Sequence, residues 1–180
     1  MALHSVEGLL DDTTDAEVRR EWAVLAEAQL PSQAGHAGPT NAPHVTLSAA
    51  GSVPEEVEAR LGRALSALPP VPVRLGPLVV MGSRRHVLAR LVVPSAALLA
   101  LHRTVAQAMD GAADVSELVR VDRWTPHVTL AHGLTAEQVG EALAVLGPLR
   151  GVDGSIERVR RWDPVARRTW SVGGIPTMGP

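Results

Sequence analysis

The sequence contains no cysteine, lysine, tyrosine or phenylalanine among its 180 residues. Without cysteine the chain forms no disulfides and no thiolate metal site, so disulfide-stabilised folds and zinc-finger-like functions are excluded. All 17 basic residues are arginine, and the formal charge of -2 lacks the positive excess expected of a protein that coats long nucleic acid. A local arginine cluster is enough to hold one phosphate, so a small nucleotide or an RNA terminus stays open as a partner.

Long apolar runs are also absent. No stretch approaches the roughly 20 consecutive apolar residues that a membrane span requires, and the first residues lack a cationic region followed by an apolar one. We therefore expect a cytoplasmic protein with no membrane association. The hydrophobic fraction of 46% suffices for a packed core. The length fits one domain, residues 1–180, and nothing in the sequence demands more than a monomer.

Helical and strand-like segments are mixed in roughly equal measure, as in an α+β fold. Capping-box patterns, in which Ser or Thr is followed three residues later by Glu or Gln, begin at Thr14, Ser52 and Thr135. Together with apolar periodicity they predict helices over residues 14–30, 52–68, 95–109 and 135–146. Strand-like runs cover residues 3–9, 44–49, 71–81, 86–93, 127–131, 152–162 and 167–172, of which the last two form a predicted hairpin. The segment 32–42, rich in Gly, Pro, Ala and His, is predicted to be a mobile loop.

A five-residue sequence occurs twice. Pro-His-Val-Thr-Leu stands at residues 43–47 and again, letter for letter, at 126–130, which is 83 residues later. Each copy begins a strand-like run, so two halves of similar architecture would each supply one copy. Because side chains alternate along a strand, His and Thr project to one face while Val and Leu project to the other. The repeat therefore predicts two polar faces, each carrying one histidine and one threonine.

These residue types suit chemistry at a phosphodiester. Imidazole titrates near neutral pH, and a threonine hydroxyl beside it hydrogen-bonds a phosphate oxygen. With two such faces opposed, one protonated histidine donates to the leaving oxygen while the other, neutral, deprotonates the attacking water or hydroxyl. A lone histidine at a strand end is more often a structural residue bonded to backbone, but duplication favours the functional interpretation.

At these residues the sequence resembles the two-histidine (2H) phosphoesterase superfamily, which includes 2'-5' RNA ligases and 2',3'-cyclic phosphodiesterases and is marked by two His-x-Thr motifs. The resemblance covers nearly the whole chain in the order of its elements. It implies two pseudo-symmetric lobes, each an antiparallel sheet backed by helices, with the motifs in a central cleft. It also implies that His44 and His127 are the catalytic acid and base and that Thr46 and Thr129 bind the phosphate. Which histidine is the acid depends on the orientation of the substrate, which the sequence does not fix; of the two arrangements we expect His44 as the acid and His127 as the base.

The resemblance has departures after each motif. Relatives often continue the first motif with a basic residue and an aromatic-rich strand, whereas residues 48–51 here read Ser-Ala-Ala-Gly. His132 stands where a basic residue is common after the second motif. We therefore expect substrate contacts that differ from those of the RNA ligases, and we include His132 among the substrate-binding residues.

The sequence thus predicts a metal-independent and cofactor-free phosphoesterase that hydrolyses, or reversibly forms, a phosphodiester at a ribose 2'-oxygen. A 2',3'-cyclic phosphate on an RNA end or a nucleotide is the expected substrate. One alternative is a phosphate or RNA-end binding module without turnover. Another is a metal-dependent hydrolase in which His36 and His132 join the motif histidines as ligands.

Arginine and tryptophan supply further candidates for substrate binding. Arg160 shares one strand face with Arg158, where the pair would steer an anionic substrate toward the motifs; surface arginines are otherwise usually solvated. Trp124 is the tryptophan that we predict to contact substrate, with stacking on a nucleobase as its use. Trp162 and Trp170 flank the final hairpin, where one would stack on a base or the two would pack on each other. Trp22 is predicted to be a core residue, and His86 and His102 are predicted to be structural or exposed.

Overall fold

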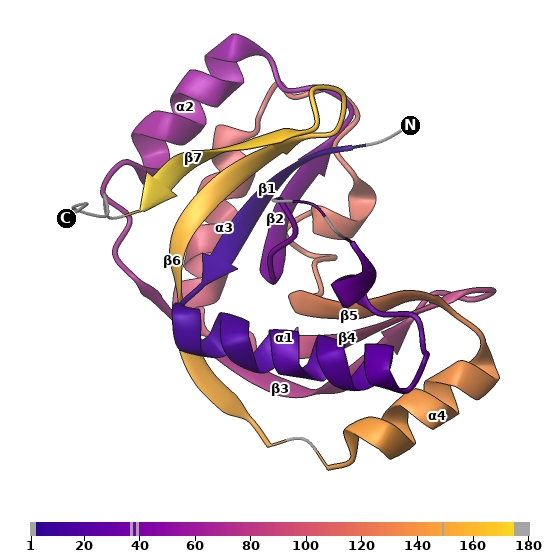
Figure 1. Cartoon of the computed structure of the whole chain (residues 1–180). Helices are drawn as coiled ribbons and strands as arrows, with labels where there is room; N and C mark the ends of the chain where they lie inside the picture. The colour runs from indigo at the N-terminus through magenta and orange to yellow at the C-terminus, as the bar shows by residue number, and fades with distance from the viewer. Residues whose placement is uncertain (1–2, 37, 39, 149, 175–180) are drawn as a thin grey trace.

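The computed structural model describes residues 3–36, 38, 40–148 and 150–174. In this part of the chain four α-helices, seven strands and two short 3-10 segments alternate (Figure 1). Their order is β1 (His4–Leu10), α1 (Asp12–Glu27), η1 (Gln33–Gly35), β2 (His44–Ala50), α2 (Glu55–Leu65), β3 (Val71–Met81), β4 (His86–Val92), α3 (Ala96–Ala108), η2 (Glu117–Val119), β5 (His127–Leu134), α4 (Ala136–Leu146), β6 (Val152–Asp163) and β7 (Arg168–Gly174). The predicted α+β class is confirmed.

All seven strands belong to one antiparallel sheet with the order β1-β2-β5-β4-β3-β6-β7 and an additional pairing of β1 with β6. The first part of β6 pairs with β3, and its later part pairs with β1 and β7. The strands therefore divide into two lobes, one built on β2, β1 and β7 and the other on β5, β4 and β3. β6 runs through both lobes, which makes them parts of one sheet instead of two separate sheets.

Each lobe is backed by two helices, one of which comes from the other half of the chain. α2 and α3 pack on each other and against the lobe of β2 and β7, whereas α1 and α4 pack on each other and against β5 (Figure 1). α1 precedes β2 in sequence but covers the lobe of β5, and α3 precedes β5 but contacts β2. This exchange of helices ties the two lobes together. None of the described helices is long and apolar enough to cross a membrane.

Helix starts follow local capping chemistry, although two of the three predicted capping boxes are wrong. The box at Thr135 is present, with both of its reciprocal hydrogen bonds. α1 instead begins at residue 12, because the Asp11 carboxylate accepts the Thr14 backbone N–H at 3.0 Å and the Thr14 hydroxyl at 2.8 Å. α2 begins three residues after Ser52, with Pro54 at its N-cap and no side-chain cap. A competing carboxylate and a proline therefore moved these two starts.

A buried ion pair joins α1 to β4. Arg90 is 1% exposed, and its Nη2 lies 3.2 Å from Oε1 of Glu21, which is 8% exposed. The same guanidinium donates to the backbone carbonyls of Gly76 and Arg150 at 2.6 and 2.8 Å. Burial raises the pKa of Glu21 to about 6, because loss of hydration outweighs the attraction of Arg90.

This raised pKa predicts a pH-dependent contribution to stability. The folded-state value of about 6 lies above the ordinary 4.5, so the folded protein holds a proton that the unfolded chain has released. The resulting stabilisation is present below pH 4.5 and is lost as pH rises through about 6, and it amounts to about 2 kcal/mol. Glutamine does not titrate, so in the Glu21→Gln variant the free energy of unfolding should change with pH by about 2 kcal/mol less than in the wild type. Urea unfolding of both proteins from below pH 4.5 to above about pH 6 measures this difference. The same pH dependence of the free energy of unfolding in both proteins would contradict a raised pKa of Glu21.

Candidate active site

The two repeated motifs begin the adjacent strands β2 and β5. These strands meet at one residue pair, Val45 opposite Val128. Both valines are fully buried, whereas the histidine and threonine of each motif are half-buried, so the predicted alternation is observed. The antiparallel register continued from this pair places the histidine of each motif opposite the threonine of the other. One sheet face thereby gathers His44, Thr46, His127 and Thr129.

Both motif histidines are held by the same backbone contact. Nδ1 of His44 lies 2.8 Å from the carbonyl oxygen of Ala42, and Nδ1 of His127 lies 2.7 Å from that of Thr125. A carbonyl oxygen only accepts, so each Nδ1 carries a hydrogen and donates it, which leaves Nε2 as the atom that exchanges a proton. The proline between carbonyl and histidine favours an extended conformation before it, which explains why proline is part of the repeat.

A buried carboxylate distinguishes the first histidine from the second. Glu7 on β1 is 4% exposed, and its Oε1 lies 3.7 Å from Nε2 of His44. Its two oxygens accept hydrogen bonds from Ser5 Oγ at 2.6 Å and Arg160 Nε at 2.7 Å. Burial alone would raise the pKa of Glu7, but the charges of His44 and Arg160 and these hydrogen bonds together lower it. An ionised carboxylate thus faces His44, and in the described part of the chain His127 has no acidic neighbour at ion-pair distance.

The sequence interpretation missed Glu7. Its only signal is a single carboxylate inside a short strand-like run in which apolar and polar residues are mixed. Its charged partners, His44 and Arg160, come from β2 and β6, far along the chain, and only the strand pairing brings them together.

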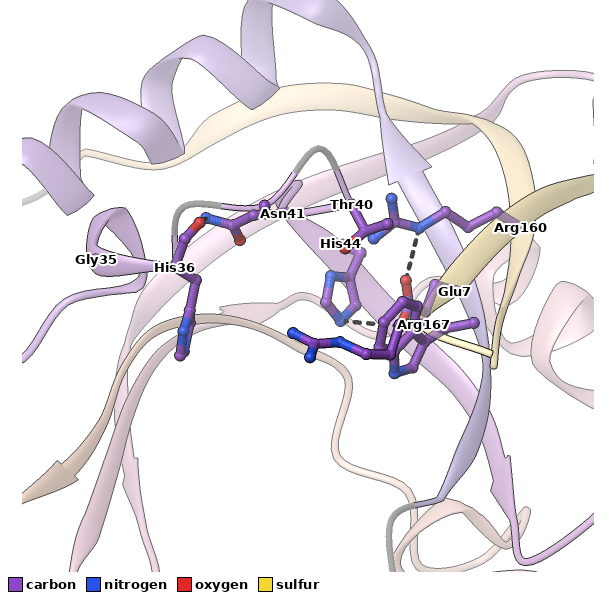
Figure 2. A pocket seen from close by; sticks show the side chains of 10 residues that line it. Glu7, Gly35, His36, Thr40, Asn41, His44, Arg160 and Arg167 are labelled. Carbon is purple, nitrogen blue, oxygen red and sulfur yellow. Dashed lines mark hydrogen bonds and ion pairs between the residues drawn. The ribbon is translucent and has the colours of Figure 1, made fainter. Parts of the chain in front are cut away.

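A cavity of about 530 Å³ opens beside His44 (Figure 2). Its walls come from β1, the loop after η1, the start of β2, and the β6–β7 hairpin. The lining side chains include Glu7, His36, Asn41, His44, Arg160, Trp162 and Arg167. The structure thus places Arg160 beside the first motif, with its Nε engaged by Glu7. His127 is not among the residues that line this cavity, which therefore lies on the side of His44.

The described part of segment 32–42 is tied to α1. Ser32 Oγ donates to the carbonyl of Trp22 at 2.6 Å, and Arg19 Nη2 donates to that of Asn41 at 3.2 Å. The Asn41 amide in turn donates to the carbonyl of His36 at 3.0 Å. These bonds hold the backbone of His36 at the edge of the cavity, into which its imidazole turns (Figure 2).

His132, predicted to bind substrate, stands on β5 with a solvent-accessible side chain. Its partial desolvation, and the charges of His36, His127 and His44, lower its pKa. His132 therefore lies within electrostatic reach of the other three imidazoles. Within the described residues, no group of three or more His, Asp or Glu side chains that could hold a metal ion is found.

Trp124 contacts the backbone of the first motif. Its indole stacks on His102 with ring centroids 3.9 Å apart, and its Nε1 donates to the carbonyl of Thr46 at 2.9 Å. Trp22, confirmed as a core residue, makes the matching bond to the carbonyl of Thr129, also at 2.9 Å. Each motif threonine thus has its backbone fixed by a tryptophan. Trp124 is not among the residues lining the cavity beside His44, and its contact with substrate stays a prediction.

The two tryptophans of the final hairpin lie on opposite faces of the sheet. β6 and β7 pair Arg161 with Trp170 and Trp162 with Thr169. Of the two alternatives for this pair, the one in which the tryptophans pack on each other is therefore wrong. Trp170 lies beside the Arg161 guanidinium and donates Nε1 to a Glu58 carboxylate oxygen at 2.6 Å, whereas Trp162 lines the cavity.

Two lobes that each contribute one His-x-Thr motif to a common sheet face define the class of this protein as a 2H phosphoesterase fold. The family model described as the 2'-5' RNA ligase superfamily matches residues 14–167. The chain belongs to this superfamily, so the resemblance seen in the sequence is confirmed. Membership in a group of phosphoesterases and RNA ligases indicates an enzyme.

Solved structures with the same fold include TT0787 of Thermus thermophilus, with a TM-score of 0.57 and 18% identity over 96% of this chain and 99% of that chain. Usb1 of Kluyveromyces marxianus has a TM-score of 0.55 and 15% identity over 95% and 97% of the two chains. A second Usb1 structure, with uridine monophosphate, has a TM-score of 0.53 and 17% identity over 95% and 96%. At these identities the likeness concerns the fold. No curated protein matches the chain significantly.

Proposed function

We propose that this protein is a metal-independent phosphoesterase that hydrolyses, or reversibly forms, a phosphodiester at a ribose 2'-oxygen. The expected substrate is a 2',3'-cyclic phosphate on an RNA end or a nucleotide. The observation that carries the proposal is the pair of motif histidines whose Nδ1 atoms are both committed to backbone carbonyls. Both Nε2 atoms are then left for proton transfer, with two threonine hydroxyls on the same sheet face.

In the hydrolytic direction, His127 is the base and His44 the acid. Neutral His127 takes a proton from the attacking water as its oxygen bonds to phosphorus, and protonated His44 gives a proton to the ribose oxygen as the P–O bond breaks. Thr46 and Thr129 donate to the non-bridging oxygens. The Glu7 carboxylate, 3.7 Å from Nε2 of His44, supports this assignment because it stabilises a positive charge on that imidazole.

A nucleotide-sized partner fits the cavity beside His44, and the Usb1 structure with uridine monophosphate supports the same class of ligand. The reverse reaction would use the same two histidines with exchanged roles. A module that binds RNA ends without turnover would keep this cavity while giving no product.

The experiment that tests the proposal is turnover of 2',3'-cyclic nucleotides, and of an oligoribonucleotide ending in a cyclic phosphate, with and without excess EDTA. We expect phosphomonoester product at an equal rate in both conditions, because the proton transfers need only imidazoles. Loss of turnover with chelator, restored by a divalent metal, would favour the metal-dependent alternative. Saturable binding without product would favour the binding module.

A further inference from the structure

We propose that the cavity beside His44 is a nucleotide subsite in which Arg167 binds a second phosphate, the one on the 5'-oxygen of the nucleoside that carries the reacting phosphate. Trp162 packs against the base of that nucleoside. The inference rests on the proposed function, since it takes the reacting phosphate to lie at the motif histidines. It narrows the substrate class to an RNA end or a 5'-phosphorylated nucleotide, as opposed to a cyclic phosphate with no second anion.

Two arginines line this cavity, and the charge of Arg167 is the one that no described carboxylate neutralises. It stands in the turn between β6 and β7, and Figure 2 shows its guanidinium directed into the cavity, toward His36 and His44. Among the residues that the structure describes, it has no ion-pair partner. The guanidinium of Arg160, in contrast, is neutralised in part by Glu7 at 2.7 Å. An anion that enters the cavity therefore finds Arg167 free to form charge-assisted hydrogen bonds.

The backbone of Arg167 adopts an unfavourable conformation at the end of this turn. Its φ of 51° lies in the left-handed region, which residues with a Cβ atom rarely adopt. The Asp163 carboxylate accepts the backbone N–H groups of Val165 and Ala166 at 2.8 and 2.9 Å, which fixes the turn just before it. Unfavourable backbone conformations gather at binding and catalytic sites, where the position of a side chain matters more than local stability.

The size and walls of the cavity match a nucleotide. Its volume of about 530 Å³ lies within the range of about 300–1,000 Å³ typical of small-molecule sites. Trp162 contributes an aromatic surface to the wall, and aromatic rings stack on any nucleobase with little sequence preference. The cavity thus offers His44 for the reacting phosphate, Trp162 for the base and Arg167 for a second phosphate.

The position of the cavity also agrees with the direction of the reaction. In hydrolysis the water attacks phosphorus opposite the leaving oxygen, and that oxygen belongs to the nucleoside. The nucleoside therefore lies on the side of the acid. The cavity adjoins His44 and not His127, and His44 is the histidine with the carboxylate beside it.

The test compares the binding of two ligands that differ by one phosphate, a nucleoside 3'-monophosphate and the 3',5'-bisphosphate of the same nucleoside. Isothermal titration calorimetry gives both Kd values for the wild type, Arg167→Gln and Arg168→Gln. Arg168 is the matched control, because it is the next residue but places its guanidinium over the ring of Trp170, 5.2 Å from the centroid, outside the cavity. Trp162→Leu is included to probe the base.

We expect the wild type to bind the bisphosphate about tenfold more tightly, as one charge-assisted hydrogen bond would give. The ratio of the two Kd values should fall toward 1 in Arg167→Gln and persist in Arg168→Gln. Trp162→Leu should weaken both ligands by about tenfold while the ratio persists. Any of three results would overturn the subsite. They are a ratio of the Kd values near 1 in the wild type, an equal loss of this ratio in both arginine variants, and no binding of either ligand.

Turnover of cyclic phosphates in the same proteins separates the subsite from the proposed function. If the protein turns over a cyclic phosphate but the ratio of the two Kd values is the same in the wild type and in Arg167→Gln, the subsite is rejected and the proposed catalysis is retained. If the ratio depends on Arg167 but no cyclic phosphate is turned over, the catalysis is rejected and the subsite is retained.

Discussion

Alanine at His44 or at His127 is expected to lower the turnover of a 2',3'-cyclic phosphate at least about a hundredfold, because each position supplies one of the two proton transfers. The loss should appear in kcat, since the proton moves in the transition state and not on binding. The two substitutions together should cost much less than the product of the single effects, because the residues act as a unit. Steady-state kinetics of the three variants at neutral pH measures both points.

His86→Ala is the matched control for these variants. His86 begins β4, opposite Leu134 at the far end of β5 from the motif, and it is not among the residues that line the cavity. It should retain turnover, and the thermal midpoints of the motif variants should stay close to that of the wild type, since both motif histidines are half-buried. Substantial turnover in either folded motif variant would show that paired proton transfer is not the mechanism.

The local features of this fold could be predicted from the sequence because they depend on neighbouring residues. The repeat was sufficient to predict which face of β2 and β5 is polar, because the alternation of side chains along a strand does not depend on its neighbouring strands. The proline of each repeat likewise acts within three residues, between a carbonyl and the imidazole that donates to it. The helix starts were less certain, because Asp11 and Pro54 lay close enough to compete with the predicted caps.

The asymmetry of the site could not be predicted, because it depends on pairings between distant strands. The identical repeats gave no reason to distinguish His44 from His127, and Glu7 distinguishes them only because β1 lies between β2 and β6. Arg160 was chosen from strand alternation, but its contact with Glu7 spans 153 positions of the chain. Arg167 was indistinguishable from other surface arginines, because its place at the cavity follows from the way the β6–β7 hairpin packs beside β1 and β2.

The second large effect is expected for Glu7→Gln, which removes the negative charge that lies 3.7 Å from Nε2 of His44. If His44 gives its proton to the leaving oxygen, a neutral side chain in this place no longer stabilises the charged imidazole, and kcat should fall by about tenfold. Steady-state rates of the wild type and the variant at neutral pH measure the loss.

Other charges also face His44, and their effects must be separated from that of Glu7. Arg160 and Arg167 line the same cavity, and the charge of His44 acts on His132 across the two motifs. Because Glu7 is buried with Arg160 as its partner, Glu7→Gln also leaves a guanidinium without its carboxylate. The Arg160→Gln variant breaks the same ion pair while it keeps the carboxylate, so its kcat should fall less than that of Glu7→Gln.

A loss of kcat in Glu7→Gln that Arg160→Gln does not share would identify the charge of Glu7 as the cause, because both variants lose the same ion pair. An equal loss in both would assign the effect to disruption of the pair itself. Urea unfolding of each variant provides the independent measure of that disruption, since a folded and stable Glu7→Gln protein with a lowered kcat has lost only the charge beside His44. An unchanged kcat in a folded Glu7→Gln protein would remove the reason for assigning the acid to His44 rather than to His127.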